Sequence, residues 1–421
     1  MRLFKSLLRL LFLFSVVLSL SSLLRAQDSN TLGYFIETAQ TNSPILNDYN
    51  NQVISNRIDS LRLRASYGFI LTGEGDGMYA PIVHGWGYDE VITNGQSFFA
   101  SARVTKQIIG NKNLKTRLDS YRASIVQVQA QKDISIKTLD KQITDQYIAT
   151  YTNQQQYKLS EEIITLLNKE DEVLKELTRQ SVFKQTDYLT FKVTLQQNQL
   201  TLQQQKADWQ NNYLLLNYLA GVVDTSVQEL SLPDIGETFS SPVFGESVYA
   251  KAFQADSTKL ANDAKIIEYD YKPKISAFSD GGYQSSFTIR PYKKFGVSVG
   301  VAITLPIYNG HQKQMLLQQN QLALETRKKY ALQVEKQYRQ QVFQLNQQIR
   351  QYEQMIDMAN EQIEYANTLV EANAKQLPTG DVQMVDFILS INNLLNLKAN
   401  IIQYNNALFS FKNQLTYLII Q

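Results

Sequence analysis

The chain has 421 residues, of which 43% are hydrophobic, which is enough for two or three domains with a sizeable core. Its 41 Lys and Arg against 39 Asp and Glu leave a net charge of +2, and no basic stripe is interleaved with aromatic residues. This balance argues against a nucleic-acid partner. The absence of cysteine excludes disulfides, thiol catalysis and Cys-based metal sites, and the two histidines, His84 and His311, are far apart in sequence.

The first 26 residues are typical of a secretory signal peptide. Arg2, Lys5 and Arg9 precede an apolar and Ser-rich run, and Ala26 offers a small residue before a cleavage site at Gln27. A retained membrane anchor is the alternative, although the run is shorter than the ~20 residues that a spanning helix needs. We expect the mature chain to begin near Gln27, outside the cytoplasm. No later apolar run reaches this length, so spanning a membrane would require strands of a closed barrel.

The chain repeats itself once. Residues 104–111 align with residues 303–310 at an offset of 199, and the same offset carries Asp187 onto Asp386 and Leu195 onto Leu394. So long a period excludes a solenoid and indicates a two-fold duplication. The first repeat is predicted to cover residues 27–221 and the second residues 248–421, with a Gly- and Pro-rich linker at 222–247.

Each repeat is predicted to contain two strands, because alternating and aromatic-rich segments flank turn-prone residues. In the last of these, Val297, Val299, Val301 and Ile303 share one face, and small or polar residues share the other. This pattern is typical of a transmembrane β-barrel, but a soluble hairpin alternates in the same way. The aromatic residues of these segments either form girdles at the two membrane interfaces or are present only because aromatic residues favour strands. They are Tyr67, Tyr79, Phe98, Phe99, Tyr283, Phe287 and Tyr308. The predicted strands are 66–79, 96–109, 274–287 and 294–308.

A long helix is predicted after each pair of strands, because about 65 residues pass without Pro or Gly. At 1.5 Å per residue, such a helix is about 100 Å long. In the second copy, apolar residues alternate at spacings of three and four, which predicts a left-handed supercoil with neighbouring helices. This seam consists of Val342, Leu345, Ile349, Tyr352, Ile356, Ala359, Ile363, Ala366 and Val370. The predicted helices are 31–64, 112–178, 185–220, 311–377 and 381–421.

The turn that follows the second long helix carries a recognisable motif. Residues 378–388 contain Gly380 and Asp381, and Asp386 follows and is itself followed by Phe387 and Ile388. The first copy has Ser181 in place of the glycine, and Ser tolerates a positive φ less readily. With the duplication, the strand exit at residues 305–310 and the long hairpins, the mature chain resembles the TolC outer-membrane factor family.

This resemblance implies a mixed, mainly α fold with four transmembrane β-strands per chain, which would close a 12-stranded barrel in a homotrimer. The helices would form a tunnel across the periplasm. The implied function is passive export of small molecules or polypeptides, in a tripartite efflux or type I secretion system. The implied partners are a periplasmic adaptor protein, an inner-membrane pump and outer-membrane lipid, and no cofactor, metal or nucleic acid is implied.

The resemblance also implies which residues carry the function. Asp187 and Asp386 are expected at the periplasmic entrance, where carboxylate rings would narrow the pore and favour cations. The alternative is that each Asp caps the helix that it begins. The candidates for adaptor contact, whose alternative role is turn chemistry, are Ser181, Val182, Leu377, Pro378, Thr379 and Gly380.

Other motifs are weaker. Residues 73–77, Gly-Glu-Gly-Asp-Gly, could suggest a phosphate or calcium loop, but no helix with a GK[ST] sequence follows, so we interpret the glycines as a flexible loop. No nucleophile with an associated base is found, and we expect no enzyme. The main rival hypothesis is a periplasmic or surface coiled-coil protein with a structural or adhesive role. Such a spacer has no need of duplicated strands before each long helix.

Overall fold

The computed structural model describes residues 30–89, 91, 95–236, 243–286 and 291–419. The predicted signal peptide lies outside these residues. The described residues divide into two compact units, of which one lies within residues 1–46, 133–247 and 335–421, and the other within residues 47–132 and 248–334. Each unit contains parts of both predicted repeats. We call them the hairpin unit and the sheet unit.

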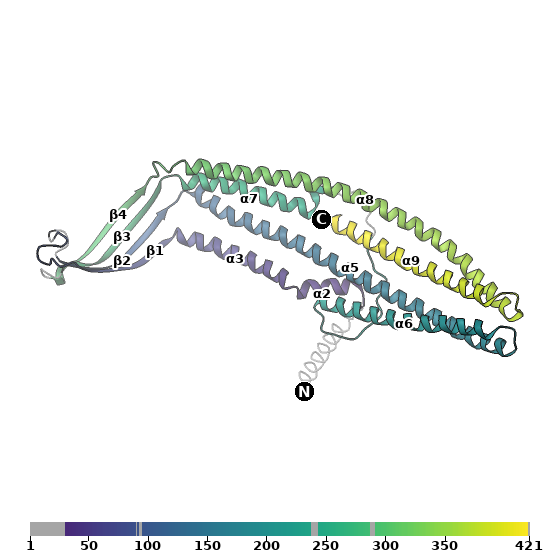
Figure 1. Cartoon of the computed structure of the whole chain (residues 1–421). Helices are drawn as coiled ribbons and strands as arrows, with labels where there is room; N and C mark the ends of the chain where they lie inside the picture. Colours follow the sequence, from purple (N-terminus) through teal and green to yellow (C-terminus); the bar gives the residue numbers. More distant parts are fainter. Residues whose placement is uncertain (1–29, 90, 92–94, 237–242, 287–290, 420–421) are drawn as a thin grey trace, which may run out of the picture. The chain divides into compact units, whose positions relative to one another are not determined.

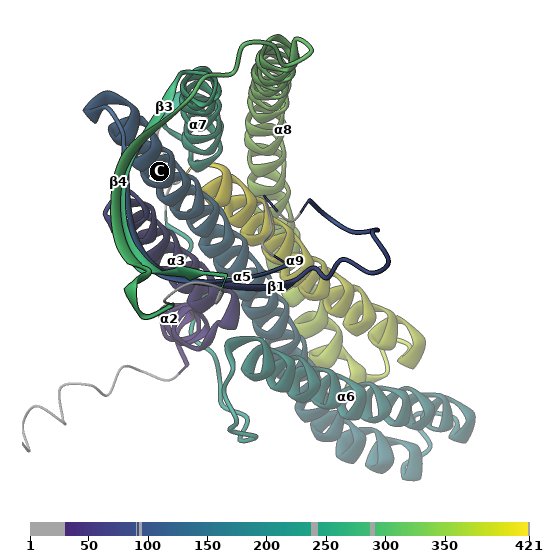
Figure 2. The ribbon, with the colours of Figure 1, turned by 90° about the vertical axis from the view of Figure 1, so that its left-hand side faces the viewer.

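The sheet unit contains four antiparallel strands in the order β1-β2-β3-β4 (Figure 1). They are β1 Phe69–Tyr79, β2 Gln96–Ile108, β3 Lys274–Ser285 and β4 Phe295–Thr304. The sheet is curved rather than flat (Figure 2). Each of the four predicted segments contains one of these strands, although β1 begins three residues later than predicted. The predicted end of the third strand, residue 287, lies outside the described residues. Strand β4 ends at Thr304 and not at residue 308, because Pro306 cannot donate to a strand ladder.

The register of the sheet separates an apolar face from a polar one. Directly paired residues point to the same side, so the pairs Arg103–Asp280 and Asp280–Ser298 place these three side chains together on the polar face. The opposite face carries Val297, Val299 and the other apolar residues of its strand, all well exposed in the single chain. It continues over the neighbouring strands with Phe69, Leu71, Tyr79, Phe98, Val104, Ile108, Ile275 and Tyr283.

Helices of the sheet unit contact one another beyond the ends of the strands. They are α3 Pro44–Ser66, α7 Val248–Asp270 and the beginnings of α5 Asn111–Arg179 and α8 Gln312–Gln376. The single helix predicted at 31–64 is wrong, because α2 Leu32–Asn42 ends before Ser43, and the residue before a proline disfavours the helical conformation. Helix α5 is tied to α7 by Gln127 Nε2, which donates to Asp256 Oδ1 (2.7 Å), and by Arg117, which pairs with Asp270.

The hairpin unit contains two helical hairpins. Helix α5 returns as α6 Gln185–Ala220, and α8 returns through a short 3-10 turn, η3 Leu377–Thr379, as α9 Met384–Ile419 (Figure 1). Every residue of the predicted α8 seam is buried or half-buried, whereas Phe343, Met358 and Tyr365 on other faces are exposed. The seam and the four long helices are therefore confirmed.

The predicted linker lies against α5 at Glu229, Leu230 and Ser231. Gln154 is buried and acts as a clamp, since its Oε1 accepts from Leu230 N–H (2.8 Å) and its Nε2 donates to Leu230 C=O (3.4 Å). Tyr147 Oη lies 2.8 Å from the carbonyl oxygens of both Asn30 and Ser231, and its one hydroxyl proton is shared between them. Leu230 also joins a hydrophobic cluster with residues of α2, α5 and α6. Satisfying the backbone of an irregular segment in this way allows it to pack without strand partners.

None of the helices that the structure describes combines the length and the apolarity needed to cross a membrane.

Gly221 ends α6 in the left-handed conformation, with φ 70° and ψ 28°. We predict that Gly221→Ala destabilises the hairpin unit by about 2 kcal/mol, because the new Cβ would be strained at this φ. The Cβ would also lie only 2.9 Å from the Cβ of Asn42. Thermal unfolding followed by circular dichroism measures this loss.

The matched control is Gly236→Ala in the linker, where an added Cβ meets no atom within 4 Å. An equal fall in the unfolding midpoint of both variants would contradict the steric explanation.

Candidate functional site at the hairpin tips

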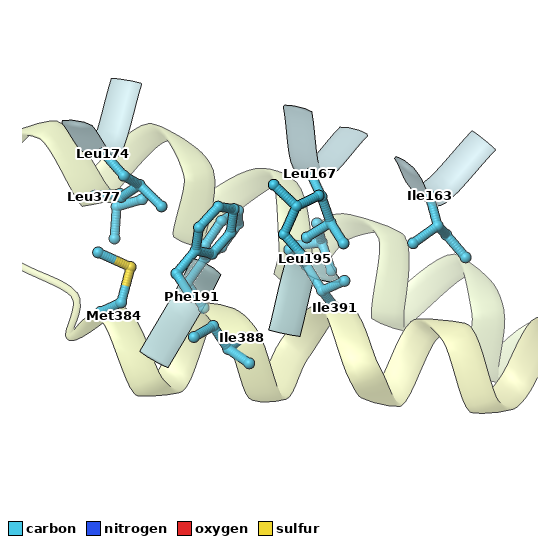
Figure 3. Packing of buried hydrophobic residues seen from close by; sticks show 11 residues of the cluster. Ile163, Leu167, Leu174, Phe191, Leu195, Leu377, Met384, Ile388 and Ile391 are labelled. Atoms are coloured by element: carbon cyan, nitrogen blue, oxygen red, sulfur yellow. The ribbon is translucent and has the colours of Figure 1, made fainter. Parts of the chain in front are cut away.

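The tips of both hairpins share one hydrophobic cluster. Leu174 of α5, Leu377 of η3 and Met384 of α9 lie together at its outer end, and Phe191 of α6 lies beside Ile388 of α9 (Figure 3). The remaining members are Ile163, Leu167, Leu195, Val370, Phe387 and Ile391. Burying two or three such side chains against one another contributes several kcal/mol, so this cluster joins the two tips.

The first tip closes with the hydrogen bonds of a Schellman motif. Val182 N–H donates to Leu177 C=O (3.0 Å), and Ser181 N–H donates to Thr178 C=O (3.1 Å). Ser181 adopts φ 64°, the left-handed conformation that Gly380 adopts in the second tip with φ 76°. The substitution of Ser for Gly therefore leaves the turn geometry intact and stores strain in the first tip.

The six predicted adaptor-contact residues divide into exposed and buried positions. Ser181, Val182, Pro378, Thr379 and Gly380 are exposed, and a Cβ built on Gly380 would lie 3.7 Å from Val182 Cγ1, so the two turns are neighbours. Leu377 is 0% exposed and belongs to the shared cluster. Its side chain holds the tip together and does not reach the surface of this chain.

Asp187 and Asp386 occupy equivalent places, each the third residue of its helix. Neither is the capping residue itself: the N-cap of α6 is Lys184, and it makes no side-chain capping bond. The capping alternative is therefore wrong for Asp187. Both carboxylates are still favoured where they are by the positive end of the helix dipole. Asp187 is half-buried and Asp386 is exposed, and no ion pair joins them to each other or to a described residue.

The two tips differ in chemistry at three equivalent positions. In the first tip, Lys192 Nζ lies 3.0 Å from Asp171 Oδ2, and this bond raises the pKa of Lys192. Burial, together with the nearby Asp171 carboxylate, raises the pKa of Tyr188. The second tip has Val370, Phe387 and Ile391 at the corresponding places, and all three are buried. At these three positions the first tip therefore holds polar side chains, which we call the polar trio, and the second tip holds hydrophobic ones. The polar trio consists of Asp171, Tyr188 and Lys192.

Glu170 is a charged residue on the apolar stripe of α5. It is only 6% exposed and falls between Leu167 and Leu174 at helical spacing. Burial raises the pKa of its carboxyl, because the charged form loses its water. Sequence reasoning missed Glu170 and the polar trio, although an acid within a three-four apolar spacing was a usable signal.

The weaker motifs do not form a second site. The glycines of residues 73–77 lie within β1 and pair with β2, so their interpretation as a flexible loop is wrong. His84 and His311 each have a positive φ, and they lie outside the helices and strands. Within the described parts of the chain, no three His, Asp or Glu side chains gather as metal ligands would.

The fold matches solved structures of outer-membrane channels over most of its length. A structure of CusC, described for its folding and transmembrane channel formation, matches with a TM-score of 0.76 at 13% identity, covering 93% of this chain and 92% of CusC. The outer-membrane protein VceC of Vibrio cholerae matches with a TM-score of 0.75 at 14% identity, over 92% of this chain and 95% of VceC. The open MtrE outer-membrane channel of Neisseria gonorrhoeae matches with a TM-score of 0.73 at 10% identity, over 93% and 89%.

No family model matches the chain, and no curated protein matches it. The likeness to outer-membrane channels is therefore a likeness of fold, and at that level the predicted resemblance is confirmed.

We predict that Ser181→Gly stabilises the first tip by about 1 kcal/mol, because glycine adopts the left-handed conformation without the Cβ strain. Hydrogen exchange of the amides near residues 177–182 measures this change as slower opening. Ser181→Val provides the opposite variant and should accelerate exchange. Equal exchange rates in all three proteins would show that the turn is not strained.

We predict that Glu170→Gln raises the midpoint of thermal unfolding at pH 7 by about 2 °C, because the amide has no charge to desolvate. The folded-state pKa is raised, so the wild type is stabilised as the pH falls and the carboxyl takes up its proton. The difference between the two proteins should accordingly shrink between pH 7 and pH 4. A difference that does not change with pH would contradict this assignment.

Proposed function

We propose that three copies of this chain form a passive channel-tunnel of the bacterial outer membrane, extending into the periplasm. The observation that carries the proposal is the match of the fold, over 92–93% of the chain, to outer-membrane channels. The function proposed is export of small molecules or polypeptides, driven elsewhere, and not catalysis.

The sheet supports both the membrane and the trimer. Its strands are 10 to 13 residues long, and a tilted membrane strand needs about 9–11. Its apolar face is exposed in the single chain, and lipid would cover it. Strands β1 and β4 are the two edges of the sheet, and their backbone groups require partners inside a membrane. Three copies would supply them by closing a barrel of twelve strands.

The hairpins support the tunnel. Exposed apolar residues on the long helices, such as Val193, Leu200 and Phe343, lie off the faces that this chain buries. Neighbouring copies would cover such residues, as coiled-coil packing does. We place Asp187 and Asp386 at the periplasmic entrance, where three copies would form rings of carboxylates that narrow the pore and favour cations.

The tips also support a docking role. The exposed turn residues Ser181, Val182, Pro378, Thr379 and Gly380 form the proposed surface for a periplasmic adaptor protein, which would connect the tunnel to an inner-membrane pump. Leu377 would act on this surface indirectly, by holding the turn on the shared cluster. A tripartite efflux system or a type I secretion system is the setting that such a docking surface fits.

Planar-bilayer conductance tests the channel and its gate together. We expect purified wild type to give small conductance steps that prefer cations. Asp187→Ala with Asp386→Ala should enlarge the steps by at least about twofold and weaken the cation preference, because a ring of carboxylates is lost. The reversal potential in a KCl gradient measures the preference.

The control variant is Asp208→Ala with Asp357→Ala, which removes two carboxylates from α6 and α8 far from the tips. If the control changes conductance as much as the gate variant does, the gating role is contradicted. A protein that stays soluble without detergent and gives no conductance would exclude the channel, and would favour a coiled-coil scaffold.

A further inference from the structure

A basic cavity lies in the sheet unit where strands give way to helices. Its volume is about 390 Å³. Its wall includes the end of β2 at Ile108, the start of β3 at Lys274, the first turn of α5 and the last turn of α7. The order of the chain places all four strand-helix junctions at this end of the sheet.

Positive charge dominates the wall of this cavity. Arg117 is neutralised, because it pairs with Asp270 and its Nε donates to Asn113 Oδ1 (2.9 Å). Lys112, Lys272 and Lys274 form no ion pair with any carboxylate in the part of the chain that the structure describes. Three like charges around one cavity repel one another, and an anion among them would remove that cost.

Aromatic side chains accompany these lysines. Tyr67 and Tyr269 line the same cavity, and Lys272 Nζ lies 4.6 Å from the centre of the Tyr269 ring. Lys106 makes a similar contact with Phe69, at 4.5 Å, at the same end of the sheet. Tyrosine beside lysine is typical of the level of lipid headgroups, where one end of the side chain is apolar and the other is hydrated.

We propose that this cavity binds the phosphate group of an anionic phospholipid in the periplasm-facing leaflet. The inference rests on the proposed function, since only a membrane-inserted sheet brings its strand-helix junctions to the headgroup level. Lys112, Lys272 and Lys274 supply the charge that holds the phosphate, and Tyr67 and Tyr269 line the same cavity. A bound lipid at each copy would fix the depth of the sheet in the membrane.

Native mass spectrometry of the full chain in detergent tests this site by titration with dioleoylphosphatidylglycerol or dioleoylphosphatidylcholine. Wild type should bind the anionic lipid more tightly. Replacing Lys112, Lys272 and Lys274 by Gln should weaken its binding by about 100-fold, because each lost lysine accounts for roughly fivefold. Replacing the same three lysines by Arg keeps the positive charge and should retain binding. This result would show that substitution at these positions does not by itself disrupt the fold.

The matched control replaces Lys251, Lys265 and Lys328, three exposed lysines of the sheet unit outside the cavity, by Gln. An equal loss in the control, or no preference of wild type for the anionic lipid, would overturn the proposal. Binding of inorganic phosphate without binding of the lipid would also overturn the assignment to a lipid. Conductance of wild type in phosphatidylcholine bilayers tests the channel separately, so the lipid site can fail while the proposed function stands.

Discussion

The pairing of β2 with β3 is the constraint on which the sheet depends, because it joins segments that are far apart in sequence. Arg103 lies opposite Asp280, and its guanidinium reaches both Asp280 (3.6 Å) and Glu74 (3.7 Å) across three strands. Gly282 allows this register, since a Cβ there would lie 2.5 Å from Ser101 Cα. A slip by one residue would turn the apolar side chains of β3 and β4 to the polar face. Exposed ion pairs contribute little energy, so their role here is to specify the register.

A second constraint acts in the hairpin unit. A long helix with one apolar stripe cannot bury that stripe alone, so each long helix needs partners along its length. The shared cluster at the tips meets this need for four helix ends at once. The polar trio in the first tip interrupts an otherwise apolar cluster. In the turn beside it, Ser181 holds a strained conformation at the place where the second tip has a glycine. Both departures lie in the first hairpin, while the second hairpin has buried hydrophobic residues and a glycine at the equivalent positions. Departures of this kind concentrate where a structure must move or bind.

The two proposed sites differ in the sign of their charge and in the partner that each would bind. At the tips, carboxylates in the first turns of α6 and α9 and exposed turns are available to solutes and partners. At the strand-helix junctions, three lysines that form no ion pair within the described residues surround a cavity, and aromatic side chains lie beside them. A headgroup-level site and an apolar sheet face would act together, since burial of the strands and binding of phosphate favour the same depth.

The sequence by itself determined the local elements. A constant offset revealed the duplication, alternation placed the strands, and the absence of Pro and Gly placed the long helices to within a few residues. These signals are local, because backbone geometry and side-chain period are written into neighbouring residues. The candidate residues at the tips were implied by the family resemblance, which rests in part on a local motif around positions 181 and 380. Only the tertiary structure decided that Leu377 is buried, that Ser181 keeps the conformation of Gly380, and that Lys112, Lys272 and Lys274 share a cavity. Those facts depend on contacts between distant segments, and a single sequence does not record which distant residues meet.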